Sequence, residues 1–271
     1  MYRVIFYVRV CDYLWMRYLG KRGFLDEETG ILKKTVLAAF EGKAFSRETV
    51  LKQVEIFRGL TKNVEAHLAF EGLSWVRDLK DADFIGENKP LYASPVWNMR
   101  NEMGGSCYED GPLTIFGRCF LRELEARGVF IDLAHSGEEM FFSCLDSFKN
   151  VIYSHGNVFE IHSHPRNIRK KQIRALIERK SYFGLTLYRG FVGGDSVKKL
   201  VDHVSAVLDM GGENIVGIGS DLDGCDAIVG KSDHVFSEAY EELLRRNLSE
   251  NVIEQVLHKN FEDCLENFQV I

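Results

Sequence analysis

The sequence predicts an α/β fold, most economically one (β/α)-barrel-like domain that spans residues 1–271. The first observation is a repeated unit: the apolar run 129–134 ends at His135, the apolar run 151–154 ends at His155, and a helical pattern follows each. The second is the length, because an α/β barrel commonly uses about 250 residues as one domain. In such folds the residues just after the strands collect on one face, which carries the chemistry.

Seven short runs have the composition of strands, being apolar, rich in β-branched and aromatic residues, and bounded by polar residues or glycine. In chain order they cover residues 2–11, 64–70, 91–93, 129–134, 151–154, 182–188 and 214–221. No eighth run has this pattern. An open, doubly wound sheet is therefore the alternative to a closed barrel.

Helical patterns follow most of these runs. Residues 13–62 mix helical and loop signals and include a helix that Ser46 is expected to cap, whereas residues 73–113 are rich in glycine and proline and predict a long loop region. Further helices are expected at residues 114–127, 138–148, 167–179, 196–210, 235–247, 249–258 and 260–268, with Ser249 as a cap.

Composition excludes several classes of function. The formal net charge is −6 and no long basic run is present, which argues against a nucleic-acid-binding surface. The six cysteines form no CxxC pair, which favours free thiols in a reducing compartment. Arg3, Arg9 and Asp12 interrupt the apolar N-terminal stretch, so we interpret it as a strand and not as a signal peptide. No stretch approaches the ~20 apolar residues of a membrane span, and we expect a cytoplasmic protein.

Five polar residues close strand-like runs: Asp12, Glu71, His135, His155 and Asp221. Imidazole and carboxylate are the usual ligands of hydrolytic zinc, so these residues predict a site for one or two divalent metals. With two metals one carboxylate must bridge them, and Glu71 has the reach for that. Structural roles stay open, because a strand-end histidine is more often a hydrogen-bonded core or loop residue, and strand-end acids often cap the next helix.

At these positions the chain resembles the membrane (renal) dipeptidase family of the amidohydrolase superfamily. The order, spacing and local context of six segments match, and together they cover most of the chain. They are residues 71–75, 111–137, 151–155, 164–176, 216–224 and 258–268. The resemblance implies a distorted (β/α)8 TIM-like barrel, two zinc ions, hydrolysis of dipeptides that include C-terminal D-residues, and a homodimer.

The resemblance also implies roles for the strand-end residues. Glu71 would bridge the two metals, His135 and His155 would bind the second metal, and Asp12 would bind the first. Asp221 would act as general acid/base beside the attacking water.

Substrate contacts follow from the same resemblance. Arg166, with Asn167 beside it, would hold the terminal carboxylate of the substrate, a task that suits a planar guanidinium. The family carries a His or Trp in the loop after the bridging acid, and Trp97 is the best candidate for it here. A packing aromatic is an equally good interpretation of Trp97.

The first strand departs from the family pattern. The family ends this strand on a His-x-Asp pair, whereas this chain has Val10, Cys11 and Asp12. Residues i and i+2 of a strand face the same way, so Val10 stands where the ligand imidazole is expected. We therefore expect one firmly bound Zn²⁺ ion and a second that is weak or absent.

Three functions compete on these grounds. The first is a zinc-dependent dipeptidase in which metal-activated water attacks the peptide bond, with reduced activity because of Val10. The second is an impaired or inactive relative that binds a peptide or amino acid without hydrolysing it. The third is a different amidohydrolase reaction, on a lactone or an N-acyl amino acid.

Overall fold

The computed structural model describes residues 7–11, 34–40, 46–60, 65–222, 224–225, 227–230 and 235–269. The chain separates into two compact units, one centred on Arg9–Val151 and the other on Ile152–Ile271. Strand β1 (Tyr7–Cys11) contributes residues to both units.

Four parallel strands form the sheet of the first unit. They are β2 (Lys34–Phe40), β3 (Glu65–Glu71), β4 (Tyr92–Ser94) and β5 (Phe130–Asp132). The register pairs Phe40 with Glu71 and Glu71 with Ser94, so three strands end level with one another. Because parallel strands share their carboxyl edge, this alignment places the residues that follow them at one edge of the sheet.

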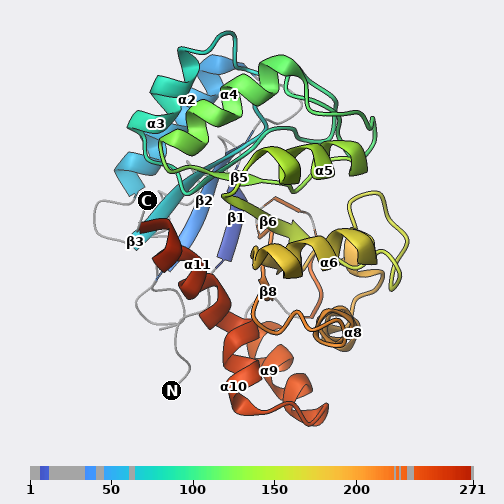
Figure 1. Ribbon diagram of the computed structural model, residues 1–271. Coiled ribbons are helices and arrows are strands. Elements are labelled where there is room, and N and C mark those ends of the chain that lie inside the picture. The colour runs from blue at the N-terminus through green and yellow to red at the C-terminus, as the bar shows by residue number, and fades with distance from the viewer. Residues whose placement is uncertain are drawn as a thin grey trace. The chain divides into compact units, whose positions relative to one another are not determined.

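Helices cover the strands of this unit. They are α2 (Arg47–Leu60), α3 (Asp81–Glu87), α4 (Ile115–Ala126) and α5 (Glu138–Ser147). Helix α2 contacts β2, α3 contacts α4 and α4 contacts β5, and Figure 1 shows α2, α3 and α4 gathered on one side of the strands. Thr114 caps α4 by accepting a hydrogen bond from the Gly117 amide, as its residue type predicts. Leu68, Phe120 and Ile131 are fully buried between these layers.

Three parallel strands form the sheet of the second unit. They are β6 (Val151–Gly156), β7 (Phe183–Leu185) and β8 (Val216–Ile218). The register of β6 against β7 shifts between Tyr153 and Gly156, which is a local irregularity of the kind found near functional sites. The shift falls on the segment that contains His155.

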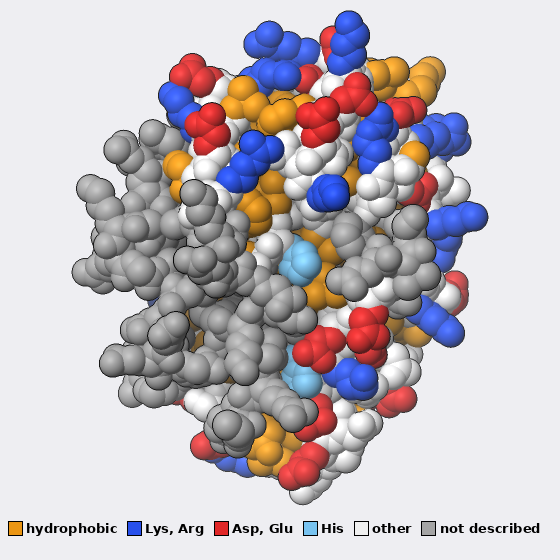
Figure 2. Space-filling model, turned by 90° about the vertical axis from the view of Figure 1, so that its left-hand side faces the viewer, with side chains coloured by type: hydrophobic (Ala, Val, Ile, Leu, Met, Phe, Trp, Pro, Cys, Tyr) orange, Lys and Arg blue, Asp and Glu red, His pale blue; other side chains and the backbone are white. Residues whose placement is uncertain are grey.

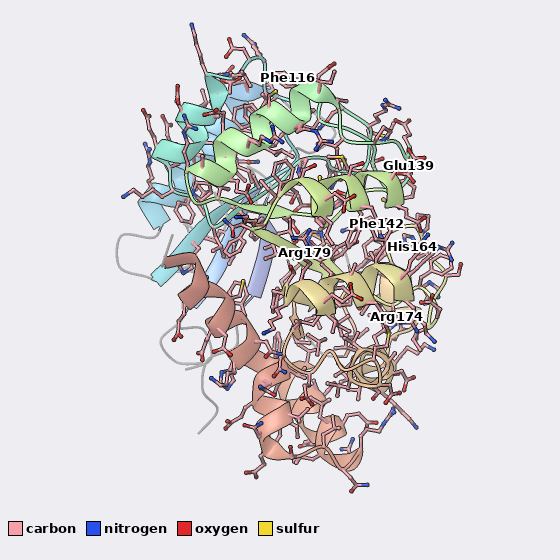
Figure 3. The ribbon with its side chains drawn as sticks, viewed as in Figure 1. Phe116, Glu139, Phe142, His164, Arg174 and Arg179 are labelled. Atoms are coloured by element: carbon pink, nitrogen blue, oxygen red, sulfur yellow. The ribbon has the colours of Figure 1, made fainter. Side chains whose placement is uncertain are left out.

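The helices of the second unit pack on these strands. Helices α8 and α11 both contact β8. In α6, Ile173 and Leu176 are buried while Arg174 and Arg179 are exposed, which is the division expected of an amphipathic helix (Figure 3). The helices are α6 (Lys170–Arg179), α7 (Arg189–Val192), α8 (Val197–Leu208), α9 (Val235–Arg245), α10 (Glu250–Glu254), the π-helix η2 (Gln255–Lys259) and α11 (Asn260–Gln269).

The predicted alternation of parallel strands and helices is confirmed, and so are the caps at Ser46 and Ser249. The sequence predicted seven strands, whereas the described residues contain eight. The strand that the prediction missed is β2. The run 36–40 is apolar throughout and contains two alanines, so its pattern does not distinguish a buried strand from a helix. Residues 2–6 of the predicted first strand lie outside the described residues. The single-domain organisation stays a prediction.

The distribution of surface charge and the length and polarity of the helices both bear on function. Figure 2 shows one face of the molecule, on which acidic and basic side chains are interspersed around small hydrophobic patches. Within the described residues, every helix is too short or too polar to cross a bilayer.

Candidate metal centre

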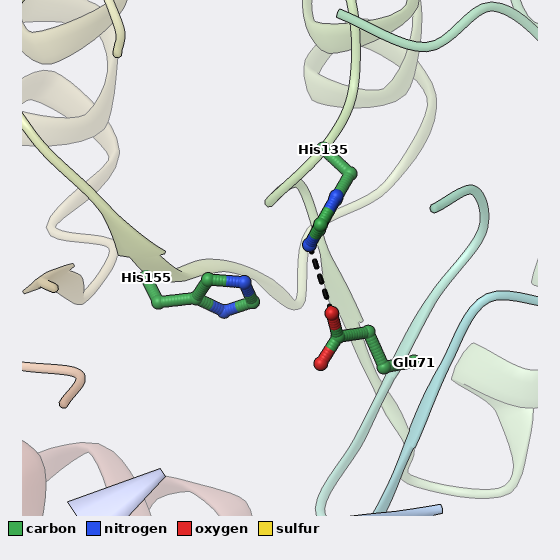
Figure 4. Close-up of side chains that lie close together, drawn as sticks. All are labelled: Glu71, His135 and His155. Carbon is green, nitrogen blue, oxygen red and sulfur yellow. Dashed lines mark ion pairs between the residues drawn. The ribbon is translucent and has the colours of Figure 1, made fainter. Parts of the chain in front are cut away.

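Glu71 and His135 form a buried pair in the first unit. Glu71 is the last residue of β3, and His135 lies three residues after the end of β5. The imidazole Nε2 of His135 is 2.8 Å from Oε1 of Glu71, and the two residues are only 4% and 2% exposed (Figure 4). The sheet register therefore brings together two of the residues that the sequence singles out as metal ligands.

The backbone of His135 adopts an unusual conformation. Its φ is +68°, in the left-handed region that non-glycine residues rarely occupy. Asp221, at the end of the strand-like run that includes β8, also has a positive φ of +57°. Non-glycine residues in this region cost free energy and cluster at functional sites, because the surrounding structure must hold them there.

His155 lies in β6, within the irregular part of that strand. It is buried, and its Nδ1 is hydrogen-bonded to the Ser154 hydroxyl at 2.8 Å. Burial, and secondarily the positive charge of Arg166, lower the pKa of His155 well below 6.5. The imidazole is therefore neutral at pH 7, which is the form that binds metals.

Arg166 is a buried cation in the second unit. Its Nη2 donates a hydrogen bond to the His155 carbonyl at 3.3 Å, and its Nη1 is 3.5 Å from the Tyr153 hydroxyl. The guanidinium lies 5.3 Å from the centre of the Phe191 ring. These contacts fix the guanidinium beside the segment that carries His155.

Asp221 is a buried acid in the same unit. Burial raises the pKa of its carboxyl to about 7, and the charge of Arg166 opposes this rise. A carboxyl with this pKa exchanges protons near neutral pH, as a general acid/base requires.

The residues present fit a zinc site by their chemistry. Glu71, His135 and His155 are all buried, and each offers one ligand atom, a carboxylate oxygen or an imidazole nitrogen (Figure 4). Two imidazoles and one carboxylate are the protein ligands of several hydrolytic zinc sites, which leave a further position open. Asp12, the predicted ligand of the first metal, lies outside the described residues.

The two remaining predicted substrate contacts have structural partners. The Asn167 amide donates to the carbonyls of His162 at 2.9 Å and Phe191 at 2.8 Å, and so ties its own loop to helix α7. The Trp97 ring packs edge-on against Phe40 at 4.9 Å and lies 6.3 Å from the His135 ring. Trp97 therefore lines the surroundings of His135, and its contact with substrate stays a prediction.

Sequence patterns did not reveal the polar contacts that support His135. The Ser94 hydroxyl donates to Oδ2 of Asp132 at 2.5 Å, and Oδ1 of Asp132 accepts from the Ala134 amide at 3.1 Å. Oδ1 of Asn98 is 3.0 Å from Nδ1 of His135. The available signals were the position of Ser94, directly after the short predicted strand at 91–93, and that of Asp132, an acid within the run that ends at His135.

Comparison with known sequences places the chain among peptidases. The model of the membrane dipeptidase family (peptidase family M19) matches residues 48–270. "Dipeptidase tcpJ" of Claviceps purpurea is 27% identical over 151 residues, which is 53% of this chain and 36% of that protein. An "uncharacterized protein in pqqA 5'region" of Klebsiella pneumoniae is 25% identical over 166 residues, 52% of this chain and 61% of that protein. The matched part is thus less than two thirds of either relative.

Solved structures share the fold. An amidohydrolase from Pseudomonas aeruginosa has a TM-score of 0.84 at 19% identity, covering 98% of this chain and 96% of that one. A dipeptidase of family M19 scores 0.83 at 16% identity, covering 97% of both chains. A metallopeptidase from Rhodobacter sphaeroides, liganded with a phosphinate mimic of the dipeptide L-Ala-D-Ala, scores 0.79 at 17% identity, covering 97% of this chain and 98% of that one. The predicted α/β barrel fold class is confirmed.

Proposed function

Since the chain belongs to the membrane dipeptidase family, peptidase family M19, we propose that it is a metal-dependent dipeptidase. The observation that carries the proposal is the buried Glu71–His135 pair, because a carboxylate and an imidazole held 2.8 Å apart away from water are a ready-made half of a metal site. The similar Rhodobacter sphaeroides metallopeptidase binds a dipeptide mimic with a D-residue, which supports a small peptide as substrate.

We propose that Glu71, His135 and His155 together hold one Zn²⁺ ion. The neutral state of His155 and the donor set of the three residues support this assignment. The second position would depend on Asp12 and a shared Glu71, since Val10 occupies the place of the family's histidine. Two carboxylates alone are a weak zinc site, so the second ion is expected to be loosely bound or absent.

The mechanism assigns separate tasks to the remaining residues. When bound, zinc supplies Lewis-acid activation of the peptide carbonyl and of water. Asp221, whose pKa of about 7 suits both states, accepts the proton of the attacking water and returns it to the leaving amine. Arg166 receives the terminal carboxylate of the substrate in a two-pronged interaction. Asn167, next to Arg166, ties its own loop to helix α7, and Trp97 packs beside His135.

Val10 supports a second candidate, a relative that binds a peptide or amino acid without hydrolysing it. An amidohydrolase shares the fold of this chain, so a different amidohydrolase reaction is the third candidate function. Cytoplasmic location and a homodimer stay predictions from the sequence and the resemblance.

Hydrolysis and binding assays on the purified protein distinguish the three candidate functions. Release of free amino acids from L-Ala-L-Ala and L-Ala-D-Ala is measured with zinc or manganese, with and without a chelator. We expect turnover that the chelator removes and that His135→Ala abolishes. Absence of turnover at saturating metal, with measurable dipeptide binding by calorimetry, would favour the non-hydrolytic candidate. Hydrolysis of a lactone in place of dipeptides would favour the third.

A further inference from the structure

The loop between β4 and α4 (residues 95–114) surrounds His135 and contacts both its ring and its backbone. On the ring, Oδ1 of Asn98 is 3.0 Å from Nδ1 of His135. An amide oxygen can only accept a hydrogen bond, so Nδ1 must carry the proton. In the neutral imidazole the lone pair then lies on Nε2, which is the atom that faces Glu71.

In this tautomer the unprotonated Nε2 of His135 faces a carboxylate oxygen of Glu71. A lone pair on Nε2 and a carboxylate oxygen at 2.8 Å are both electron donors, so they repel each other unless a proton or a metal ion lies between them. Both atoms are buried, so bulk water does not screen the repulsion. A divalent metal satisfies both atoms at once, and an imidazole whose other nitrogen is hydrogen-bonded is the usual form of a histidine ligand.

Ser106 in turn fixes Asn98. Its hydroxyl donates to the Asn98 carbonyl at 2.9 Å and accepts from the amides of Tyr108 at 3.3 Å and Glu109 at 3.1 Å. The Ser106 side chain is fully buried, so no water competes for these contacts. The hydroxyl therefore links the turn at 106–109 to the backbone of the residue that contacts the His135 ring.

The same loop holds the backbone of His135. The Cys107 amide donates to the His135 carbonyl at 2.7 Å, and the Gly137 amide donates to the Gly105 carbonyl at 3.3 Å. These bonds flank the residue whose φ is +68° and compensate for that unfavourable conformation. A side chain at Gly105 would overlap the backbone of Gly111, so the loop requires glycine there.

We propose that Asn98 is a positioning residue for metal binding: its side-chain oxygen sets the tautomer and ring orientation of His135, and Ser106 holds Asn98 in place. The inference rests on the proposed metal site. It adds a loop residue that touches neither metal nor peptide but determines which nitrogen of His135 is offered to the metal.

The test compares zinc affinity and histidine protonation in four proteins. They are the wild type, Asn98→Leu, Asn98→Asp and Asn101→Leu. Zinc affinity is measured by competition with a chromophoric chelator, and the zinc-loaded proteins are labelled with ¹⁵N-histidine for NMR, with His135→Gln identifying the His135 signals. In wild type we expect a protected proton on Nδ1 of His135. Asn98→Leu should weaken zinc binding about 10- to 100-fold and lose that proton signal.

Asn98→Asp keeps an acceptor and should restore both readouts. Asn101 is the matched control, because among the described residues its side chain bonds to the Pro95 carbonyl and the Met103 amide, both in the same loop. Asn101→Leu should lower thermal stability yet keep the Nδ1 proton and the affinity. Unchanged zinc affinity in Asn98→Leu, or an equal loss in Asn101→Leu, would overturn the inference while leaving the metal site intact. No zinc binding by wild type would instead refute the proposed site, and the inference with it.

Discussion

Gly219 lies directly against the backbone carbonyl of Ser154, so close that a Cβ at Gly219 would overlap the carbonyl oxygen. Gly184 on the neighbouring strand approaches the same oxygen in the same way. Ser154 immediately precedes His155, and Gly219 lies two residues before Asp221. The absence of side chains at two glycines therefore allows the segments that carry His155 and Asp221 to pack closely within the second unit.

Gly219→Ala is expected to destabilise the protein, because the added methyl must displace backbone and not a flexible side chain. Overpacking of this kind costs about 1–3 kcal/mol or more, and activity should fall as His155 and Asp221 move. Urea denaturation and dipeptide hydrolysis measure the two effects. Gly59→Ala is the matched control, since Gly59 lies in α2 and no atom of the described residues is within 4 Å of the added carbon. That variant should be neutral or more stable by roughly 0.5–1 kcal/mol, and equal losses in both variants would contradict the packing argument.

Asp221→Asn is expected to stabilise the metal-free protein above pH 7. Below pH 3.8 the Asp221 carboxyl is protonated in both the folded and the unfolded state, so it contributes no pH dependence there. Between pH 3.8 and about 7 the unfolded state releases the proton while the folded state retains it, so the free energy of unfolding falls as pH rises. Asp221→Asn has no carboxyl to titrate, so its free energy of unfolding does not fall in this way. The difference in unfolding free energy between the variant and wild type should therefore grow by roughly 1.4 kcal/mol per pH unit across that range, to a few kcal/mol.

Chemical denaturation at pH 4, 5.5 and 7.5 measures this difference. Asp209→Asn, at an exposed position after α8, controls for the removal of one carboxyl group as such. A stability difference between wild type and Asp221→Asn that stays constant with pH would disprove the raised pKa.

Arg166→Ala is expected to raise KM by one to two orders of magnitude with a smaller effect on kcat, because the proposed role of Arg166 is to bind the terminal carboxylate of the substrate. Arg166→Lys keeps the charge but loses the planar fork, so it should recover only part of the affinity. Steady-state kinetics with L-Ala-L-Ala, and with its C-terminal amide as a substrate that lacks the carboxylate, separate the contributions. Wild type and Arg166→Ala should have similar KM and kcat values for the amide substrate. A defect of Arg166→Ala that is confined to kcat would rule out carboxylate anchoring.

Val10→His is expected to raise the zinc content from about one towards two ions per chain, and to raise the rate of hydrolysis, because it restores the imidazole that the family places two residues before Asp12. Elemental analysis after dialysis against micromolar zinc measures the change. Cys11→His is the matched control, since adjacent residues of a strand face opposite sides, and it should leave the zinc content unchanged. A zinc content that Val10→His does not alter would mean that Val10 is not the cause of a weak first site.

Much of the architecture could be read from local pattern. Strands such as Val151–Gly156 and helices such as Ile115–Ala126 have the periodicity and end residues that define them within ten or so residues of sequence. Strand β2 (Lys34–Phe40) could not be predicted in this way, because its run of apolar residues at 36–40 carries no alternation of polar and apolar positions. The role of Ser94 was equally hidden, since its partner Asp132 is 38 residues away in the chain.

The sequence by itself determined the alternation of strands and helices and the candidate ligands at strand ends, and it predicted that Val10 replaces a ligand histidine. Each of these features depends only on residues that are close together in the sequence, or on the type of residue at one position. Only the tertiary structure decided that Glu71 lies 2.8 Å from His135, that Oδ1 of Asn98 contacts the His135 ring and that burial raises the pKa of Asp221 to about 7. Those properties arise from burial and from contacts between distant segments, which no local pattern of residues encodes.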